Sequence, residues 1–137
     1  MKFEARVVGR AKIREDRRVF LDHAHLVGAD FSGRRLDSFG AYGSRLEKCR
    51  FDKSRIDSAS FGEGKEVSEY VDCSFDGARF CPGPGGYYRF VRCSFKNVNI
   101  YDWFCFAVEL VDCTFSGKMR GAVFNGTPHD EIGRAHV

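Results

Sequence analysis

Large apolar residues recur at every fifth position along much of this 137-residue chain. Eight of the first nine positions in this series are Phe, Leu or Ile. The series runs Leu21, Leu26, Phe31, Leu36, Ala41, Leu46, Phe51, Ile56 and Phe61. A period of five matches neither the face of a helix nor the simple alternation of a strand. It predicts a coil in which each five-residue side turns one large residue inward.

A small residue stands two positions before most of the large ones. The small set is Ala24, Ala29, Ser44, Cys49, Ser54, Ala59, Ser68, Cys73, Ala78, Gly83, Cys93 and Cys113. A second period of twenty overlies the first, because residues 71–75 (Val-Asp-Cys-Ser-Phe) recur at 91–95 and 111–115 with one substitution each. Four five-residue sides therefore make one turn of the coil.

The twenty-residue register predicts inward columns with one residue per turn. The core columns are Phe31, Phe51, Phe75, Phe95 and Phe115, with the small partners Ala29, Cys49, Cys73, Cys93 and Cys113. Successive turns should lie ~4.8 Å apart and be joined by backbone hydrogen bonds. Stacked rings and small side chains would then fill a narrow core at high density.

This pattern resembles the pentapeptide-repeat family, whose consensus is approximately Ala-(Asp/Asn)-Leu-X-X. Residues 29–33 (Ala-Asp-Phe-Ser-Gly) match it best, and the resemblance covers about residues 21–126. The resemblance implies an all-β fold, a right-handed parallel quadrilateral β-helix of about five turns. The frequent Phe at the large position and Cys at the small position depart from the family consensus.

The chain divides into three parts. Residues 2–14 alternate between apolar and polar side chains, as a half-buried strand does. Because a solenoid needs its first turn covered, we expect an N-terminal β cap over residues 1–20 and the β-helix over residues 21–126. We expect residues 127–137 to be a truncated tail, because residues 132–137 resemble the read-through of a sequencing adapter. A last coil left open in this way would be covered by the missing segment or used for a homodimer.

The register breaks on the fourth side of the coil. Four extra residues bulge out near 62–67, and turn residues at 81–86 replace a strand. Large and small positions also exchange there, which would turn Phe104 and Phe106 outward. Since exposed aromatic residues can mark a partner site, the candidate interaction face is Tyr87, Tyr88, Tyr101, Phe104 and Phe106. Alternatively, the N-terminal strand or a missing C-terminal segment covers these rings.

The charges of the chain are nearly balanced, with 22 Lys and Arg against 19 Asp and Glu. The excess of positive charge lies in residues 1–20, whose net charge is +4. Two outward columns nevertheless have a pattern. The candidate basic column is Arg35, Arg55 and Arg79, and the other column is His25, Arg45, Glu69, Arg89 and Glu109. The basic column needs a carboxylate such as Asp57 or an anionic partner to offset its repulsion. The second column alternates in sign from Arg45 onward and predicts an exposed ionic ladder.

No motif for chemistry is present, so we expect no catalytic residue, no cofactor and no metal site. The four core cysteines would rise as a line, whereas zinc requires a tetrahedron of ligands. They are predicted to be thiols that fill the core as small apolar groups. His23 and His25 alternate on a strand and could chelate a metal, but exposed polar positions explain them better.

These features favour a non-enzymatic scaffold that binds a protein partner. One alternative is a DNA-mimicking modulator of DNA gyrase, because some pentapeptide-repeat proteins bind gyrase; such mimicry needs a strongly negative face, which this body lacks. Another is a weak nucleic-acid binder through its basic face, for which interleaved aromatic residues are missing. No stretch reaches the length of a membrane helix and no signal-peptide core opens the chain, so a cytoplasmic location is expected.

Overall fold

The computed structural model describes residues 6–14, 17–63, 65–82, 85–101, 104–120 and 123–125. These residues contain thirteen strands. The strands are β1 (Arg6–Arg14), β2 (Arg18–Val27), β3 (Arg35–Leu36), β4 (Ser38–Tyr42), β5 (Arg45–Glu47), β6 (Arg55–Glu63), β7 (Ser68–Val71), β8 (Arg79–Pro82), β9 (Gly85–Val91), β10 (Ser94–Tyr101), β11 (Phe104–Val111), β12 (Thr114–Arg120) and β13 (Val123–Asn125). In this described part of the chain, no helix is long and apolar enough to cross a membrane.

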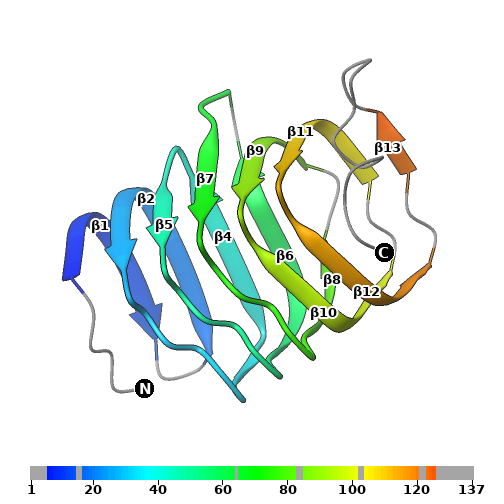
Figure 1. The fold of residues 1–137 in the computed structure, drawn as a ribbon. Coiled ribbons are helices and arrows are strands. Elements are labelled where there is room, and N and C mark those ends of the chain that lie inside the picture. The colour runs from blue at the N-terminus through cyan, green and yellow to red at the C-terminus, as the bar shows by residue number, and fades with distance from the viewer. Residues whose placement is uncertain are drawn as a thin grey trace.

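The strands form one sheet that winds into a β-solenoid of about four stacked turns (Figure 1). Apart from the pairing of β1 with β2, the pairings are parallel and join each strand to the equivalent strand one turn away. The expected β-helix is confirmed. The expected count of about five turns was slightly too high.

The register shows why the repeat pattern predicts the fold so well. Leu26 pairs with Leu46, Leu46 with Tyr70, and Tyr70 with Phe90. These steps are 20, 24 and 20 residues. One of the four extra residues lies in β6, where Gly40 pairs with Ser60 but Tyr42 pairs with Glu63, and the other three lie between β6 and β7. The predicted bulge is therefore confirmed, and it leaves the side on which Tyr70 lies in register with its neighbours.

A stack of phenyl rings runs through the core. Phe31, Phe51, Phe75, Phe95 and Phe115 are at most 3% exposed. Successive ring centroids are separated by 5.0, 4.8, 4.8 and 4.5 Å, and the last three pairs are within 4° of parallel. The ring spacing equals the distance between hydrogen-bonded strands, so the backbone ladder itself sets the stacking distance.

The small partner column is also buried, as predicted. Cys49, Cys73, Cys93 and Cys113 are thiols at most 2% exposed. Two of the thiols donate to a carbonyl one coil earlier: Cys93 Sγ lies 3.2 Å from the Tyr70 oxygen, and Cys113 Sγ lies 3.3 Å from the Phe90 oxygen. Burial raises the pKa of Cys93, which keeps that thiol protonated and able to donate.

Two buried serines, Ser44 and Ser68, accept hydrogen bonds from backbone amides of the preceding coil. Ser44 Oγ accepts from the Ala24 amide at 3.1 Å, and Ser68 Oγ accepts from the Ser44 amide at 3.1 Å. An unpaired buried amide costs about 1–3 kcal/mol, so these hydroxyls replace hydrogen bonds that the strand ladder leaves unmade. Serine at the small position therefore contributes a hydrogen-bond acceptor as well as a small volume.

An antiparallel hairpin closes the N-terminal end. Strand β1 pairs with β2 from Arg6 opposite Val27 to Arg14 opposite Arg18, with a bulge between Val8 and Arg10. Figure 1 shows β1 lying along the outer edge of β2 at this end of the solenoid. The hairpin gives β2 a hydrogen-bonding partner on the edge where no earlier coil exists.

Candidate functional site

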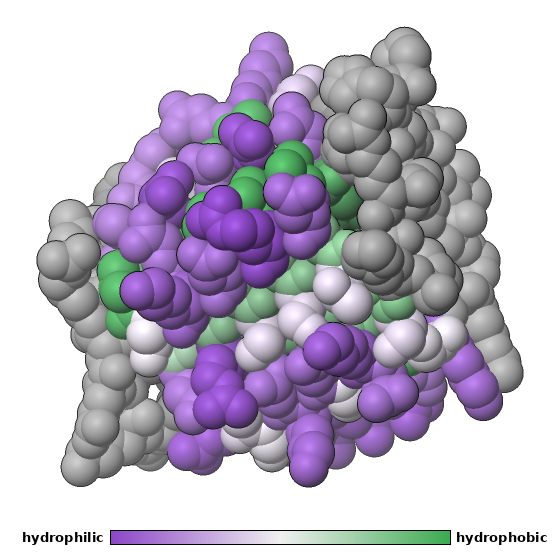
Figure 2. Space-filling model, viewed as in Figure 1, coloured by the Kyte–Doolittle hydropathy of each residue, from purple (hydrophilic) through white to green (hydrophobic). Residues whose placement is uncertain are grey.

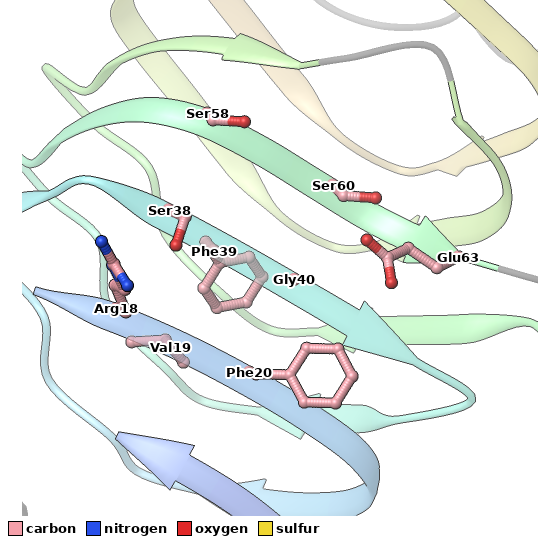
Figure 3. Close-up of a pocket in the computed structure, with 9 residues that line it drawn as sticks. All are labelled: Arg18, Val19, Phe20, Ser38, Phe39, Gly40, Ser58, Ser60 and Glu63. Carbon is pink, nitrogen blue, oxygen red and sulfur yellow. The ribbon is translucent and has the colours of Figure 1, made fainter. Parts of the chain in front are cut away.

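A groove lies on the fourth side of the solenoid, across the parallel strands β2, β4 and β6 (Figure 3). Its volume is about 340 Å³. Small residues form the floor, and Arg18, Phe20 and Glu63 stand around it. The floor consists of Ser38, Gly40, Ser58 and Ser60. The register explains this composition, because Phe20, Gly40 and Ser60 occupy equivalent outward positions on three successive coils.

Phe20 gives the groove an apolar wall. Its side chain is 42% exposed, whereas its neighbours Val19 and Leu21 are buried. A Cβ at Gly40 would lie 3.4 Å from Phe20 Cδ2 and 3.6 Å from Glu63 Oε1, so the absence of a side chain at Gly40 creates the depth. Figure 3 shows the Phe20 ring and the Glu63 carboxylate on either side of Gly40.

Sequence reasoning marked the fourth side but missed this groove. The predicted site consisted of exposed aromatic rings near the C-terminal end, whereas the groove results from the absence of a side chain at Gly40. The available signal was Phe20, a large residue at an outward position between two inward ones. On this side, the predicted exchange of large and small positions is confirmed at β4, where Phe39 and Ala41 are both buried.

The candidate aromatic face is only partly on the surface. Tyr87 is 43% exposed and Tyr101 is half-buried. For Tyr88 the prediction was wrong: its side chain is 2% exposed, and its ring packs 5.6 Å from Phe90 and 5.9 Å from Phe61. The side chains of Phe104 and Phe106 lie outside the described residues.

The repeat itself could have placed Tyr88 correctly. Tyr88 stands two positions before Phe90, at the position that small inward residues occupy in other coils, and it pairs with the buried Ser68. The preceding side has glycine at Gly85, where other sides have a large residue.

The basic column forms as predicted. Arg35 pairs with Arg55, and Arg55 pairs with Arg79, on successive coils. Asp57 lies between the first two, with its carboxylate 3.2 Å from the Arg35 guanidinium and 3.3 Å from that of Arg55. The hydrogen bond from Arg35 lowers the pKa of Asp57. The predicted role of Asp57 as the offsetting carboxylate is confirmed.

Arg79 differs from the other two arginines of the column. Its Cζ lies 5.9 Å from the centroid of the Tyr101 ring, within range of a cation–π contact. Tyr101 belongs to the candidate aromatic face, so the structure joins one member of each predicted set. Arg79 and Tyr101 line a second cavity of about 320 Å³ together with Asn99 and Lys118.

The alternating column forms the expected ionic ladder. Glu69 accepts from Arg45 at 3.0 Å and lies 3.5 Å from Arg89, which in turn lies 3.4 Å from Glu109. These side chains are about one-third to one-half exposed, so each pair contributes little stability. Figure 2 shows hydrophilic side chains in two bands on the side of the solenoid in view, separated by a less polar strip.

His23 links the first coil to the inserted loop. Its Nδ1 lies 2.6 Å from Asp22 Oδ1, and its Nε2 lies 2.5 Å from Glu66 Oε2. Sequence reasoning paired His23 with His25 and missed Glu66, because Glu66 is 43 residues away and lies in the insertion. Among the described residues, no group of three or more His, Cys, Asp or Glu side chains could hold a metal ion.

This histidine makes the loop sensitive to pH. The hydrogen bond to Asp22, and then that to Glu66, raises the pKa of His23 above its ordinary value of 6.5. The stabilisation is therefore complete below about pH 6.5 and is lost as the pH rises through the raised pKa. We expect His23→Gln to lower the melting temperature more at about pH 6 than at about pH 9. Circular dichroism melts check this, and Glu66→Gln should show the same dependence; equal losses at both pH values would contradict it.

Taken by its fold and its surface, the protein is a parallel β-solenoid with a filled core and a shallow groove on one side. Neither a family model nor a curated protein sequence matches the chain.

Proposed function

We propose that the chain is a non-enzymatic pentapeptide-repeat protein that acts as a scaffold for a protein partner. The five-residue pattern and the stacked coils support the family assignment. A solenoid of this kind supplies a rigid, extended surface and no chemistry of its own. The partner contact is the groove on the fourth side.

The groove carries this proposal because it combines an exposed apolar ring with a floor that a partner can approach closely. Phe20 is one of three exposed large apolar side chains among the described residues, with Val67 and Tyr87, and it is the one that borders the groove. Aromatic residues beside a concave surface are typical anchors of protein interfaces. The serine hydroxyls of the floor can donate and accept hydrogen bonds without filling the space.

The surroundings also favour binding over catalysis. The described titratable groups at the groove are Arg18 and Glu63, which stand at its border and not around one point. General acid–base chemistry requires groups within hydrogen-bond reach of a common reacting atom. Serine without a neighbouring base is a poor nucleophile, so the groove hydroxyls are suited to recognition.

Filling the groove tests the proposal. Gly40→Arg adds a long side chain at a position whose backbone tolerates it, since the nearest atoms belong to the Phe20 and Glu63 side chains. Val67→Arg adds the same side chain at a 50% exposed site outside the groove. Tagged protein is used to capture partners from nuclease-treated and untreated extract, and mass spectrometry identifies them.

We expect the wild type and Val67→Arg to capture the same protein with and without nuclease, and Gly40→Arg to capture at least about tenfold less. Circular dichroism verifies that each variant is folded. Retention of the partner by Gly40→Arg would remove the groove from the interface. A partner that disappears after nuclease treatment would overturn the proposal in favour of nucleic acid.

A further inference from the structure

We infer that the cavity at Arg79, Asn99, Tyr101 and Lys118 binds a small phosphate ester that carries an aromatic ring and has the size of a nucleoside monophosphate. The cavity holds this ligand by its phosphate group. This site lies apart from the groove on β2, β4 and β6 and does not depend on the function proposed for that groove. The inference rests on a change in charge pattern along the basic column.

The first two arginines of the column share Asp57, as described above. Asp57 stands two residues after Arg55, and Asp37 stands two residues after Arg35. From the third coil onward, these acidic positions are lost. Cys81 stands two residues after Arg79, and Tyr101 stands two residues after Asn99.

Residues with hydrogen-bond donors continue along this column on the coils that lack the acidic residues. Arg79 pairs with Asn99, and Asn99 pairs with Lys118, so the three residues occupy one outward column on three successive coils. Among the described residues, no carboxylate lies within ion-pair distance of Arg79 or Lys118. The column thus changes from two arginines that share one carboxylate to two cations that flank an amide.

The spacing suits a single phosphate group above Asn99. Two coil spacings separate Arg79 from Lys118, about 10 Å along the sheet. Both side chains are long enough to converge on a group placed over the middle coil. A guanidinium fork, an amide N–H and an ammonium group match the several oxygens of a phosphate better than the two oxygens of a carboxylate.

Tyr101 makes the site suited to a ligand that is larger than a free phosphate ion. Its ring holds the Arg79 guanidinium at 5.9 Å, which limits the freedom of that side chain before a ligand arrives. The cavity of about 320 Å³ lies within the size range of small-molecule sites and exceeds what one phosphate group fills. The half-buried Tyr101 ring lines the same cavity and offers an aromatic surface to a base.

A small ligand fits this pattern better than a nucleic-acid strand. A strand needs cations that continue along its path, but on the N-terminal side of Arg79 both arginines of the column are engaged by Asp57. The stretch of cations without a carboxylate partner therefore begins at Arg79. We expect one phosphate-binding cluster and not a polyanion track.

Isothermal titration with adenosine monophosphate, adenosine, inorganic phosphate and an oligothymidylate distinguishes these ligands. We expect saturable binding of the monophosphate, weaker binding of inorganic phosphate and none of adenosine. Arg79→Gln or Lys118→Gln should weaken the monophosphate at least about tenfold. Arg55→Gln is the matched control, because it removes a charge from the same column at a position that is paired with Asp57 and does not line the cavity, and it should leave binding unchanged.

Both substituted side chains are exposed, and circular dichroism of each variant verifies the fold. The inference is wrong if the monophosphate gives no saturable binding, or if Arg79→Gln and Lys118→Gln bind it as the wild type does. Tighter binding of the oligothymidylate than of the monophosphate, with an equal loss in Arg55→Gln and a steep dependence on salt, would assign the column to nucleic acid instead.

Discussion

Phe75→Ala is expected to lower the free energy of unfolding by about 3–5 kcal/mol, the cost of removing a fully buried aromatic ring. Phe75 lies at the middle of the phenyl stack, 4.8 Å from both Phe51 and Phe95. Phe61 and Phe90 meet its ring edge-on at 5.9 and 5.7 Å. The substitution therefore removes packing on both faces and at the edge of one ring.

The solenoid cannot close the resulting space easily. Backbone hydrogen bonds between coils fix the spacing above and below Phe75, with Phe51 N donating to the Ser74 oxygen and Phe75 N donating to the Ser94 oxygen, both at 2.7 Å. A cavity that the surroundings cannot fill adds its own cost to the lost transfer free energy. We therefore expect the loss to fall in the upper part of the range.

Phe20→Ala is the matched control, because it makes the same chemical change at a ring that is 42% exposed. It should cost no more than about 1 kcal/mol. Urea denaturation followed by circular dichroism gives both values. A Phe75→Ala loss as small as that of Phe20→Ala would mean that the phenyl stack does not support the fold.

The period of five predicts the columns so well because a solenoid repeats one local rule in every coil. Phe31, Phe51, Phe75, Phe95 and Phe115 are each placed by their spacing to the next turn, and no long-range information is needed. The same rule accounts for the failure at Tyr88. Its aromatic character suggested a surface site, but its place two residues before Phe90 already made it an inward residue.

The candidate sites depend on contacts that spacing does not encode. Glu66 reaches His23 from an insertion whose path is set by the loop and not by the repeat. The groove at Gly40 depends on a missing side chain beside an outward Phe20. Arg79 contacts Tyr101 because equivalent sides of neighbouring coils are adjacent. The twenty-residue register implies this contact. The sequence prediction missed it because it assigned Arg79 to a basic set and Tyr101 to an aromatic set.

The glycines at one corner of the coil illustrate the limit of the repeat rule. This corner is occupied in successive turns by Gly33, Lys53, Gly77, Asn97 and Gly117, all with positive φ. Lys53 and Asn97 have φ of 56° and 57°, so side chains are tolerated there at moderate cost. Gly117 has φ of 110°, a conformation that glycine alone adopts readily.

Gly117→Ala is therefore expected to destabilise the protein by about 3 kcal/mol, the sum of backbone strain and forced overpacking. A Cβ at this position would lie 2.3 Å from the Val98 carbonyl oxygen and 2.6 Å from its amide nitrogen. These are backbone atoms of the preceding coil and cannot rotate away. The close approach arises because β12 has one residue fewer than β10 between its pairings at Phe115 and Gly117.

Gly33→Ala is the matched control. Gly33 occupies the same corner with φ of 70°, but a Cβ there would meet no atom within 4 Å. It should cost only about 1 kcal/mol, from the left-handed backbone alone. Urea denaturation of both variants gives the difference, which measures the steric contact together with the additional backbone strain at φ of 110°. If Gly117→Ala cost no more than Gly33→Ala, the close contact between these coils would have to relax without loss, and the coil spacing would be softer than its hydrogen bonds imply.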